Sequence, residues 1–489
     1  MGAVRTRVDE AFRRADLLDP LLGSYLARFT DEAAATAAEL DQYGGEAGPL
    51  HGLLTGVKDV LATRERVATG QSRIFDEQWY AGREGAAVRR LREAGAVVLG
   101  KTSMAEHGLS RPDPEQNSPI ARNPWDPDRW TGGSSCGSAN GLPAELFDAT
   151  VGTDTNGSIR IPAALCGVTG FKPTYGLVPV DGCRPLSRSL DTVGSLAHTA
   201  RDAARLVAVM AGRHGEPFAP RRDLHGVRVG VPHQLLEQAA ALSPDCTAAF
   251  DSALATLRTA GAETVDVPLN EVFPLVAAQL ATMLAEAFEV HGDGLRKRWN
   301  AYSRPFRRTI VLGGLVTDAT CARAQRVRQQ GAGRLRARFA DVSVIATPTW
   351  PTTAPRCDDA AALQAVSWLP SPWSAVGFPA IAVPMGFGAD GLPLSLQLAG
   401  PPGDDFALAA VADCYQRQTG WHLRRPRLEP GTAPAPVAEP QPAPAGEDER
   451  EWMAARLHEL GVRVDDAEAA AIAGTWSGYS RLWGAMPEA

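Results

Sequence analysis

An alternation of amphipathic helices with short β-branched runs limits the folds that this chain can adopt. REGAAVRRLREAG at 83–95 has the spacing of a helix with one apolar face, and AVVLG at 96–100 follows it like a buried strand. Similar apolar runs recur at 226–232 and 341–348. A chain of this pattern folds as an α/β protein with a largely buried sheet. We also expect helices over 1–45 and over most of 233–340.

The composition changes near the C-terminus. The segment PGTAPAPVAEPQPAPAG over 430–446 alternates Pro and Ala without an apolar pattern, which predicts an extended linker. Two short helices are expected beyond it, the second capped by Asp465 or Asp466. Such a short tail cannot bury a core alone. We therefore predict a main domain over 1–429, a linker over 430–446, and a helical tail over 447–489 that packs on the main domain or on a neighbouring subunit.

Charge and cysteine usage exclude several functions. The net charge is −7 without a dense Lys/Arg tract, which disfavours nucleic acid or an anionic membrane as partner. No apolar run approaches the ~18 residues of a membrane span, and the N-terminus lacks the apolar core of a signal peptide. The seven cysteines are scattered without a CxxC pair, which argues against a zinc site and for a reducing cytoplasm. We expect a cytoplasmic protein that uses no metal and no cofactor.

Lysine is scarce, with only Lys58, Lys101, Lys172 and Lys297 against 45 Arg among the 49 basic residues. Biased codon usage is one explanation. However, Arg cannot lose its proton in a protein, whereas a buried Lys can and then acts as a base. Three of the four lie in the first 172 residues, and the lysine pattern alone does not tell which of these three is a base.

Several segments match known sequence motifs, but the residues around them do not predict the structure that each motif requires. GAVVLGKT at 95–102 fits a phosphate-binding loop, but it follows a helix and is itself strand-like. GSSCG at 133–137 fits a nucleophile elbow centred on Ser135, but two prolines and no strand precede it. Cys136 as a thiol nucleophile lacks a neighbouring His. Asn156-Gly157 fits a hairpin turn, but only three extended residues separate Ser158 from Pro162.

Three segments taken together resemble the amidase signature family. They are LLTGVKDVL around Lys58, TGGSSCGSANG around Ser134, and GTDTNGSIRIPAALCGVTGFKPTYG around Ser158. The resemblance continues at 189–204, 345–356, 377–386 and 391–400, and so spans about residues 45–420. It implies a large mixed, twisted sheet with helices on both faces, and makes 1–429 the catalytic domain.

The resemblance also implies a mechanism. Matched motif to motif, Ser158 is the nucleophile, Ser134 is a bridging serine after a cis peptide, and Lys58 is a base that burial keeps uncharged. Backbone N–H groups of Thr155, Asn156, Gly157 and Ser158 would hold the oxyanion. Asp154 and Arg160 would brace this loop, although a purely structural ion pair explains them equally well.

Two residues depart from the family pattern, in which glycines usually stand at positions 136 and 156. Asn tolerates the left-handed conformation best among non-Gly residues, so we expect the loop at Asn156 to keep its geometry. Cys136 places a small polarisable group beside Ser134. The spelling DTNGSIR is similar to 1-carboxybiuret hydrolases, and the tail is similar to the small accessory subunits of glutamyl-tRNA amidotransferases.

The predicted function is hydrolysis of a small-molecule amide other than a peptide, with a ureido or carbamoyl compound as one candidate. Transfer of the same acyl group to an amine and a non-catalytic binding role remain alternatives, and so does a homodimer. Six aromatic residues are candidates to line the substrate pocket, although a place in the core is the more common fate of each: Trp299, Tyr302, Phe306, Trp350, Trp368 and Trp373.

Overall fold

One mixed sheet runs through the protein. The computed structural model describes residues 2–43, 47–109, 111, 113, 119–238, 242–359, 368–431, 434, 436–438 and 445–487. The strands are β1 (Tyr25–Arg28), β2 (Leu54–Lys58), β3 (Val97–Thr102), β4 (Ala149–Asp154), β5 (Thr169–Lys172), β6 (Thr192–Ala197), β7 (Arg228–Val231), β8 (Glu263–Asp266), β9 (Val344–Pro348), β10 (Ala380–Phe387) and β11 (Pro393–Ala399). Their order is β1-β3-β2-β4-β6-β5-β10-β11-β9-β7-β8. Because β2 runs parallel to β3 and β4 while β4 runs antiparallel to β6, the sheet is mixed, as predicted.

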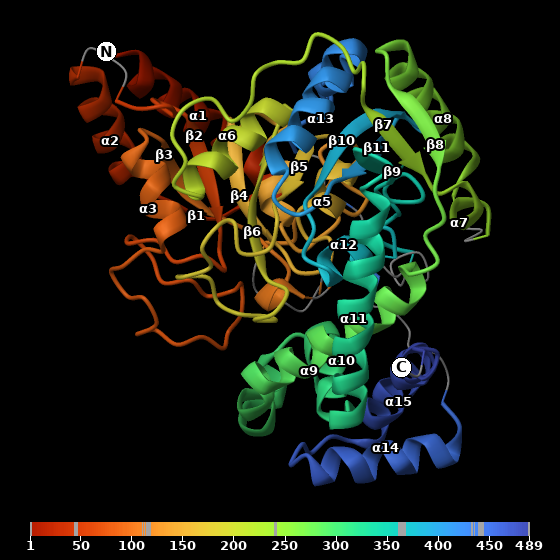
Figure 1. Ribbon diagram of the computed structural model, residues 1–489. Helices are drawn as coiled ribbons and strands as arrows, with labels where there is room; N and C mark the ends of the chain where they lie inside the picture. Colours follow the sequence, from red (N-terminus) through yellow and green to blue (C-terminus); the bar gives the residue numbers. More distant parts are fainter. Residues whose placement is uncertain are drawn as a thin grey trace.

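Helices cover both faces of this sheet (Figure 1). Within β3, Val97 and Leu99 join one apolar cluster and Val98 joins another, because successive side chains of a strand point to opposite faces. One cluster includes α3 (Ala86–Glu93), α6 (Ala200–Met210), α7 (His233–Gln238), α8 (Pro244–Thr259) and α13 (Asp405–Thr419). The other includes α1 (Ala3–Leu22), α2 (Thr30–Gln42), α4 (Cys136–Asn140) and α5 (Arg160–Cys166). The predicted fold class is therefore confirmed.

The first 45 residues contain a strand that the sequence analysis missed. Gly23 adopts a left-handed conformation with φ +58° and ends α1, and β1 then pairs with β3 at the edge of the sheet. Only four residues long, β1 lies between two helices whose spacing dominates the local pattern. The expectation of helix throughout 1–45 is wrong at this point.

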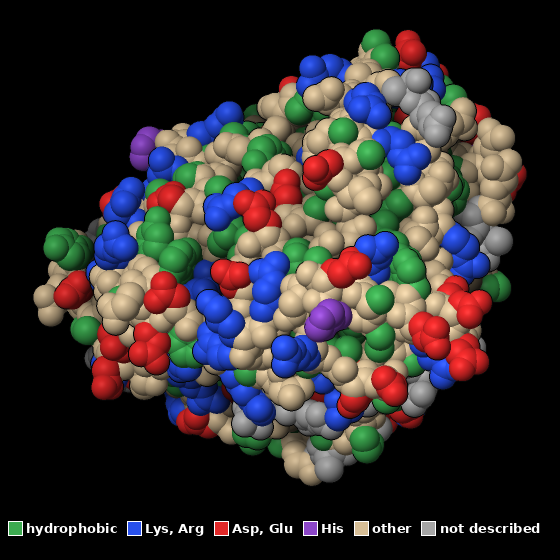
Figure 2. Space-filling view, turned by 90° about the horizontal axis from the view of Figure 1, so that it is seen from below, with side chains coloured by type: hydrophobic (Ala, Val, Ile, Leu, Met, Phe, Trp, Pro, Cys, Tyr) green, Lys and Arg blue, Asp and Glu red, His purple; other side chains and the backbone are tan. Residues whose placement is uncertain are grey.

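A group of helices projects from the sheet at one end and holds the C-terminal tail (Figure 1). It contains α9 (Val272–Arg298), α10 (Arg304–Ile310), α11 (Asp318–Arg338) and α12 (Ser371–Ala375), together with the tail helices α14 (Glu447–Glu459) and α15 (Asp466–Gly484). Short 3₁₀ turns lie at η1 (Glu106–Gly108), η2 (Trp299–Ala301), η3 (Val311–Leu315) and η5 (Trp421–Leu423). Figure 2 shows basic, acidic and apolar side chains interspersed over the face seen from below.

The tail is anchored by a buried carboxylate and an apolar stripe. Asp465 caps α15 by accepting a hydrogen bond from the Glu468 N–H. The Glu468 side chain accepts hydrogen bonds from Arg307 and Arg308 of α10, each with Nε at 2.9 Å. Met453 and Leu457 of α14 are fully buried against the α9–α11 core. The predicted linker over 430–446 lies mostly outside the described residues.

The longest helix is apolar enough to resemble a membrane span. The segment Val272–Ala301 contains an 18-residue window with a mean hydropathy of 1.3, which contrasts with the expectation that no such run exists. However, 67% of that window is buried inside the protein, where α11, α12 and the tail surround the helix. Packing in the core accounts for its apolar character.

Candidate active site

Lys58 lies at the end of β2 and is fully buried. Its Nζ donates hydrogen bonds to Ser134 Oγ and Thr153 Oγ1, both at 2.8 Å. It forms no salt bridge with any residue that the structure describes. Burial therefore dominates and lowers the pKa of Lys58 to about 8. A lysine with this pKa gives up its proton far more readily than an ordinary lysine.

Ser134 follows the cis peptide bond Gly133–Ser134, at the position where the resemblance implied one. Its carbonyl oxygen accepts a hydrogen bond from the Ala105 N–H at 3.0 Å. The Cys136 thiol, in the first turn of α4, lies 3.6 Å from the same oxygen. Burial raises the pKa of Cys136, so the thiol is protonated and packs as a small group beside Ser134.

Ser158 lies in the turn between β4 and α5 and is 9% exposed. Its carbonyl oxygen accepts the Ser135 N–H at 3.2 Å, which joins the Ser134 loop to the Ser158 loop. No hydrogen bond joins the hydroxyls of Ser134 and Ser158 among the residues described.

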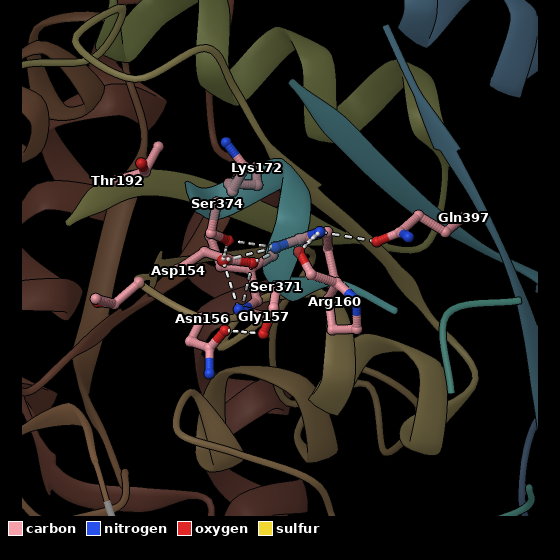
Figure 3. Close-up of polar contacts among 12 residues, drawn as sticks. Asp154, Asn156, Gly157, Arg160, Lys172, Thr192, Ser371, Ser374 and Gln397 are labelled. Carbon is pink, nitrogen blue, oxygen red and sulfur yellow. Dashed lines mark hydrogen bonds and ion pairs between the residues drawn. The ribbon is translucent and has the colours of Figure 1, made fainter. Parts of the chain in front are cut away.

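The Asp154–Arg160 pair lies beside Asn156 and Gly157 and holds the loop that leads to Ser158 (Figure 3). Arg160 Nε and Nη2 bind the Asp154 carboxylate at 2.9 and 3.0 Å, and neither side chain is exposed. The remaining guanidinium hydrogens bind the Pro370 carbonyl, Gln397 Oε1 and Ser374 Oγ at 2.7–2.9 Å. All five N–H donors of this arginine are thereby used. Burial alone would raise the pKa of Asp154, but the adjacent guanidinium outweighs it and holds that pKa well below its usual value.

The loop itself departs from expectation at two points. The left-handed backbone lies at Gly157, with φ +96°, and Asn156 is not among the described non-Gly residues with positive φ. The expectation that Asn156 keeps the loop by tolerating a left-handed backbone is therefore wrong. The Gly157 N–H donates to Asp154 at 2.8 Å, whereas the N–H groups of Thr155, Asn156 and Ser158 have no hydrogen bond to any described residue.

Several residues of this site were not recognised from the sequence. Thr153 accepts from Lys58, and the Ser135 hydroxyl donates to the Thr153 carbonyl at 3.2 Å. Asp191 accepts a hydrogen bond from the Thr155 hydroxyl at 2.6 Å, and burial raises the pKa of Asp191 to about 6. Gln279 Nε2 donates to the Thr155 carbonyl at 2.5 Å. Thr153 and Asp191 stand inside quoted motifs and could have been found there, whereas Gln279 gave no signal.

The other candidate motifs have structural roles. The GAVVLGKT segment lies largely in β3, and the hydroxyl of fully buried Ser135 is bound to Thr153. Lys101 forms a buried salt bridge with Asp59 at 3.5 Å. Lys172 Nζ donates to the Pro173 carbonyl at 2.9 Å, and burial lowers the pKa of Lys172 to about 7. Contacts thus separate the three lysines that sequence alone could not.

The aromatic candidates lie mainly in the core. Tyr302, Phe306, Trp350 and Trp373 are at most 4% exposed, while Trp299 and Trp368 are half-buried. Tyr302 and Phe306 pack with His107 and His291 in one ring cluster. Among the described residues, no group of three or more His, Cys, Asp or Glu is arranged to hold a metal ion.

Comparisons with known proteins agree with this geometry. The sequence profile of the amidase family matches residues 7–409. The chain is 37% identical over 443 residues to a glutamyl-tRNA(Gln) amidotransferase subunit from Roseiflexus castenholzii, covering 82% of this chain and 89% of that one. A chain of a vestigial protein complex that reveals the evolutionary origins of an s-triazine catabolic enzyme superposes with a TM-score of 0.77 at 28% identity, over 86% of this chain and 95% of that one. A peptide amidase bound to the competitive inhibitor chymostatin gives 0.71 at 28% identity, over 87% and 96%. The chain therefore belongs to the amidase signature family.

Proposed function

We propose that the protein is an amide hydrolase that works through an acyl-enzyme on Ser158. Lys58 is the base, Ser134 is the bridging serine, and Ser158 is the nucleophile. The observation that carries this assignment is the 2.8 Å hydrogen bond to the Ser134 hydroxyl from a fully buried lysine that has no carboxylate partner among the described residues. With a pKa of about 8, Lys58 is neutral for about a tenth of the time at pH 7, against less than about 0.1% for an ordinary lysine.

The proposed reaction has two steps, acylation of Ser158 and hydrolysis of the acyl-enzyme, and Lys58 and Ser134 relay the proton in both. Neutral Lys58 takes the Ser134 proton as Ser134 takes the Ser158 proton, and Ser158 Oγ bonds to the amide carbon. The free N–H groups of Thr155, Asn156 and Ser158 stabilise the oxyanion, while Asp154 holds Gly157 and is itself held by Arg160. The proton returns to the leaving nitrogen as the C–N bond breaks. Water then enters by the same proton path and releases the acid.

Replacement of the nucleophile tests the proposal. Ser158→Ala is expected to lower kcat by at least about 10³-fold, because members of such a triad act as one unit. Ammonia release should be followed over ureido, primary and aryl amides, with circular dichroism to confirm that the fold is intact. Normal turnover by Ser158→Ala would overturn the assignment.

Two other functions share the same site. Transfer of the acyl group or of ammonia is supported by the relatives described as amidotransferase subunits. Product analysis with an added amine separates the two for that amine, because formation of the acid alone rules out transfer to it. A non-catalytic role is supported only by the Asn156 and Cys136 departures, and covalent labelling of Ser158 by a fluorophosphonate would exclude it.

The substrate proposed is a small amide of the ureido or carbamoyl type. Its support is the DTNGSIR spelling and the fold similarity to the complex that reveals the origins of an s-triazine catabolic enzyme. We place the reaction in the cytoplasm, because all seven cysteines are free thiols and five of them are buried.

For the tail, we propose that residues 447–489 act as an accessory subunit carried in the same chain. Its support is the docking of α14 and α15 on α9–α11 through Glu468, Met453 and Leu457. The boundaries at 429 and 447 are part of this proposal, and so is the homodimer left open by the sequence.

A further inference from the structure

Asn156 occupies a glycine position of the family pattern, yet its backbone does not explain why. The loop needs one left-handed residue, and Gly157 supplies it. A glycine at position 156 would therefore leave the loop geometry unchanged. Any function specific to Asn156 must therefore come from its side chain.

The carboxamide of Asn156 is held in one orientation. The Ser371 hydroxyl donates a hydrogen bond to Asn156 Oδ1, and Figure 3 shows the amide nitrogen pointing away from Ser371. Because Oδ1 is taken, Nδ2 presents its two N–H donors on the opposite side. Among the described residues, no acceptor binds Nδ2.

The anchor of this orientation is itself rigid. Ser371 begins α12, and the preceding Pro370 carbonyl accepts from Arg160 at 2.9 Å. Ser374 of the same helix donates to Asp154 at 3.1 Å and accepts from Arg160 at 2.7 Å. The buried pair that holds the Ser158 loop thus also holds the residue that orients Asn156. Such a donor loses little entropy when it binds a ligand.

Asn156 is also the accessible member of its loop. Thr155, Gly157 and Ser158 are buried, whereas Asn156 is partly exposed. Its side chain begins two residues before Ser158, next to the N–H groups proposed to hold the oxyanion. A donor two residues from Ser158 is within reach of a substrate whose acyl carbon bonds to Ser158 Oγ.

We propose that Asn156 Nδ2 is a specificity-determining donor for a second oxygen on the acyl part of the substrate. The preferred substrate class is an amide whose acyl group carries another carbonyl or carboxylate oxygen close to the scissile carbonyl. This rests on the proposed function, because it takes Ser158 as the site of acyl transfer. A donor in a partly exposed position discriminates by about tenfold for a neutral acceptor and up to about 100-fold for a carboxylate.

Three amides of matched shape test the proposal. Malonamide, malonamate and 3-methylbutanamide share one branched skeleton and differ in whether its far end carries oxygen. The readout is the ratio of kcat/KM for each oxygen-bearing amide to that for 3-methylbutanamide. We expect ratios of about 10 for malonamide and up to about 100 for malonamate in the unaltered protein. Where turnover is too slow, protection of Ser158 from fluorophosphonate labelling gives the corresponding ratios of binding affinity.

Three variants separate the donor from the anchor. Asn156→Gly removes the donor and is expected to bring both ratios to about 1. Asn156→Asp keeps an acceptor for Ser371 but removes the donor, so the malonamate ratio is expected to fall below that of malonamide. Ser371→Ala keeps the donor but frees it to rotate, with an expected loss of about 3-fold in each ratio.

Two results would overturn the inference: ratios of about 1 for both oxygen-bearing amides in the unaltered protein, or ratios that none of the three variants changes. Asn156 would then only link the loop to α12. Those outcomes leave amide hydrolysis standing. Failure of the proposed function looks different, because no amide is then turned over and Ser158 is not labelled.

Discussion

Lys58 and Lys101 are both fully buried lysines, and they lie on the neighbouring strands β2 and β3. Their surroundings differ in one respect. Lys101 has the Asp59 carboxylate at 3.5 Å and donates to the Leu61 carbonyl, whereas Lys58 has only hydroxyl groups and a carbonyl around its Nζ. A counter-ion stabilises the charged form of a buried lysine, and its absence leaves a base. The carboxylate distinguishes Lys101 from Lys58, and the hydrogen bond to the Ser134 hydroxyl distinguishes Lys58 from Lys172, which is equally buried but donates to the Pro173 carbonyl.

The strongest test exchanges each lysine for Met. Lys58→Met is expected to lower kcat by at least about 10³-fold, with the melting temperature unchanged or raised because a poorly solvated amine is removed. Lys101→Met is expected to cost about 3–5 kcal/mol of stability, because Asp59 is left buried and unpaired, while the folded fraction keeps its activity. Amide turnover and thermal unfolding should be measured on both.

A double variant controls this contrast. Asp59→Asn combined with Lys101→Met removes both charges and should be more stable than Lys101→Met alone. A Lys101→Met protein that is inactive but has normal stability would contradict this contrast, because Lys101 would then be needed for turnover and not for stability.

The Asp154–Arg160 pair adds a third case to the comparison of the two lysines, namely a buried cation whose charge is balanced by a carboxylate. Asp154→Asn leaves Arg160 buried without its carboxylate and is expected to cost about 3–5 kcal/mol. The rate should fall as well, since Gly157 loses its acceptor. Asp293→Asn is the matched control, because Asp293 pairs with Arg296 on the surface and is 81% exposed there. Its expected change in unfolding free energy is below about 0.5 kcal/mol. Equal losses of stability in Asp154→Asn and Asp293→Asn would contradict the view that Asp154 stabilises a buried arginine.

The pH dependence tests the Lys58 side of this contrast. Only neutral Lys58 accepts a proton, and its pKa of about 8 lies below the ordinary 10.5. We expect kcat/KM to rise about tenfold per pH unit below pH 8 and to level off above it. The unfolded chain binds the additional proton between pH 8 and 10.5, so the Lys58 contribution to stability becomes more favourable as pH rises through that window. A flat rate profile from about pH 6 to about pH 8 would remove Lys58 as the base.

The smallest effect is expected where a charge is only partly buried. Glu468→Gln weakens the contacts of α15 with Arg307 and Arg308, whose side chains are 11% and 20% exposed. The expected loss is about 1–2 kcal/mol, measured as a shift of the unfolding midpoint. Glu451→Gln on α14, at an exposed position, is the control. A shift equal to that of the control would mean that apolar contacts alone hold the tail.

The features of this protein that depend on local sequence pattern could be predicted from the sequence. Helix and strand alternation predicted the α/β class, and spaced motifs placed Lys58, Ser134 and Ser158, which the fold brings into one region. The missed parts depend on distant contacts. Asn156 meets Ser371 across 215 residues, and β1 becomes a strand only because β3 offers it an edge. Likewise the Lys58 and Lys101 environments differ through Asp59, which is adjacent in sequence to Lys58 but pairs with Lys101.

The five-donor arrangement of Arg160 also has a consequence for the synthesis of the chain. Its partners Pro370, Ser374 and Gln397 follow it by 210, 214 and 237 residues. At the usual pace of translation, roughly 10–50 s separate the emergence of Arg160 from that of Gln397. Throughout that interval the nascent protein carries Ser158 without the scaffold that fixes its loop. The loop that carries Ser158 therefore gains its full set of contacts only after most of the polypeptide has been made, and a product truncated before Gln397 lacks one of them.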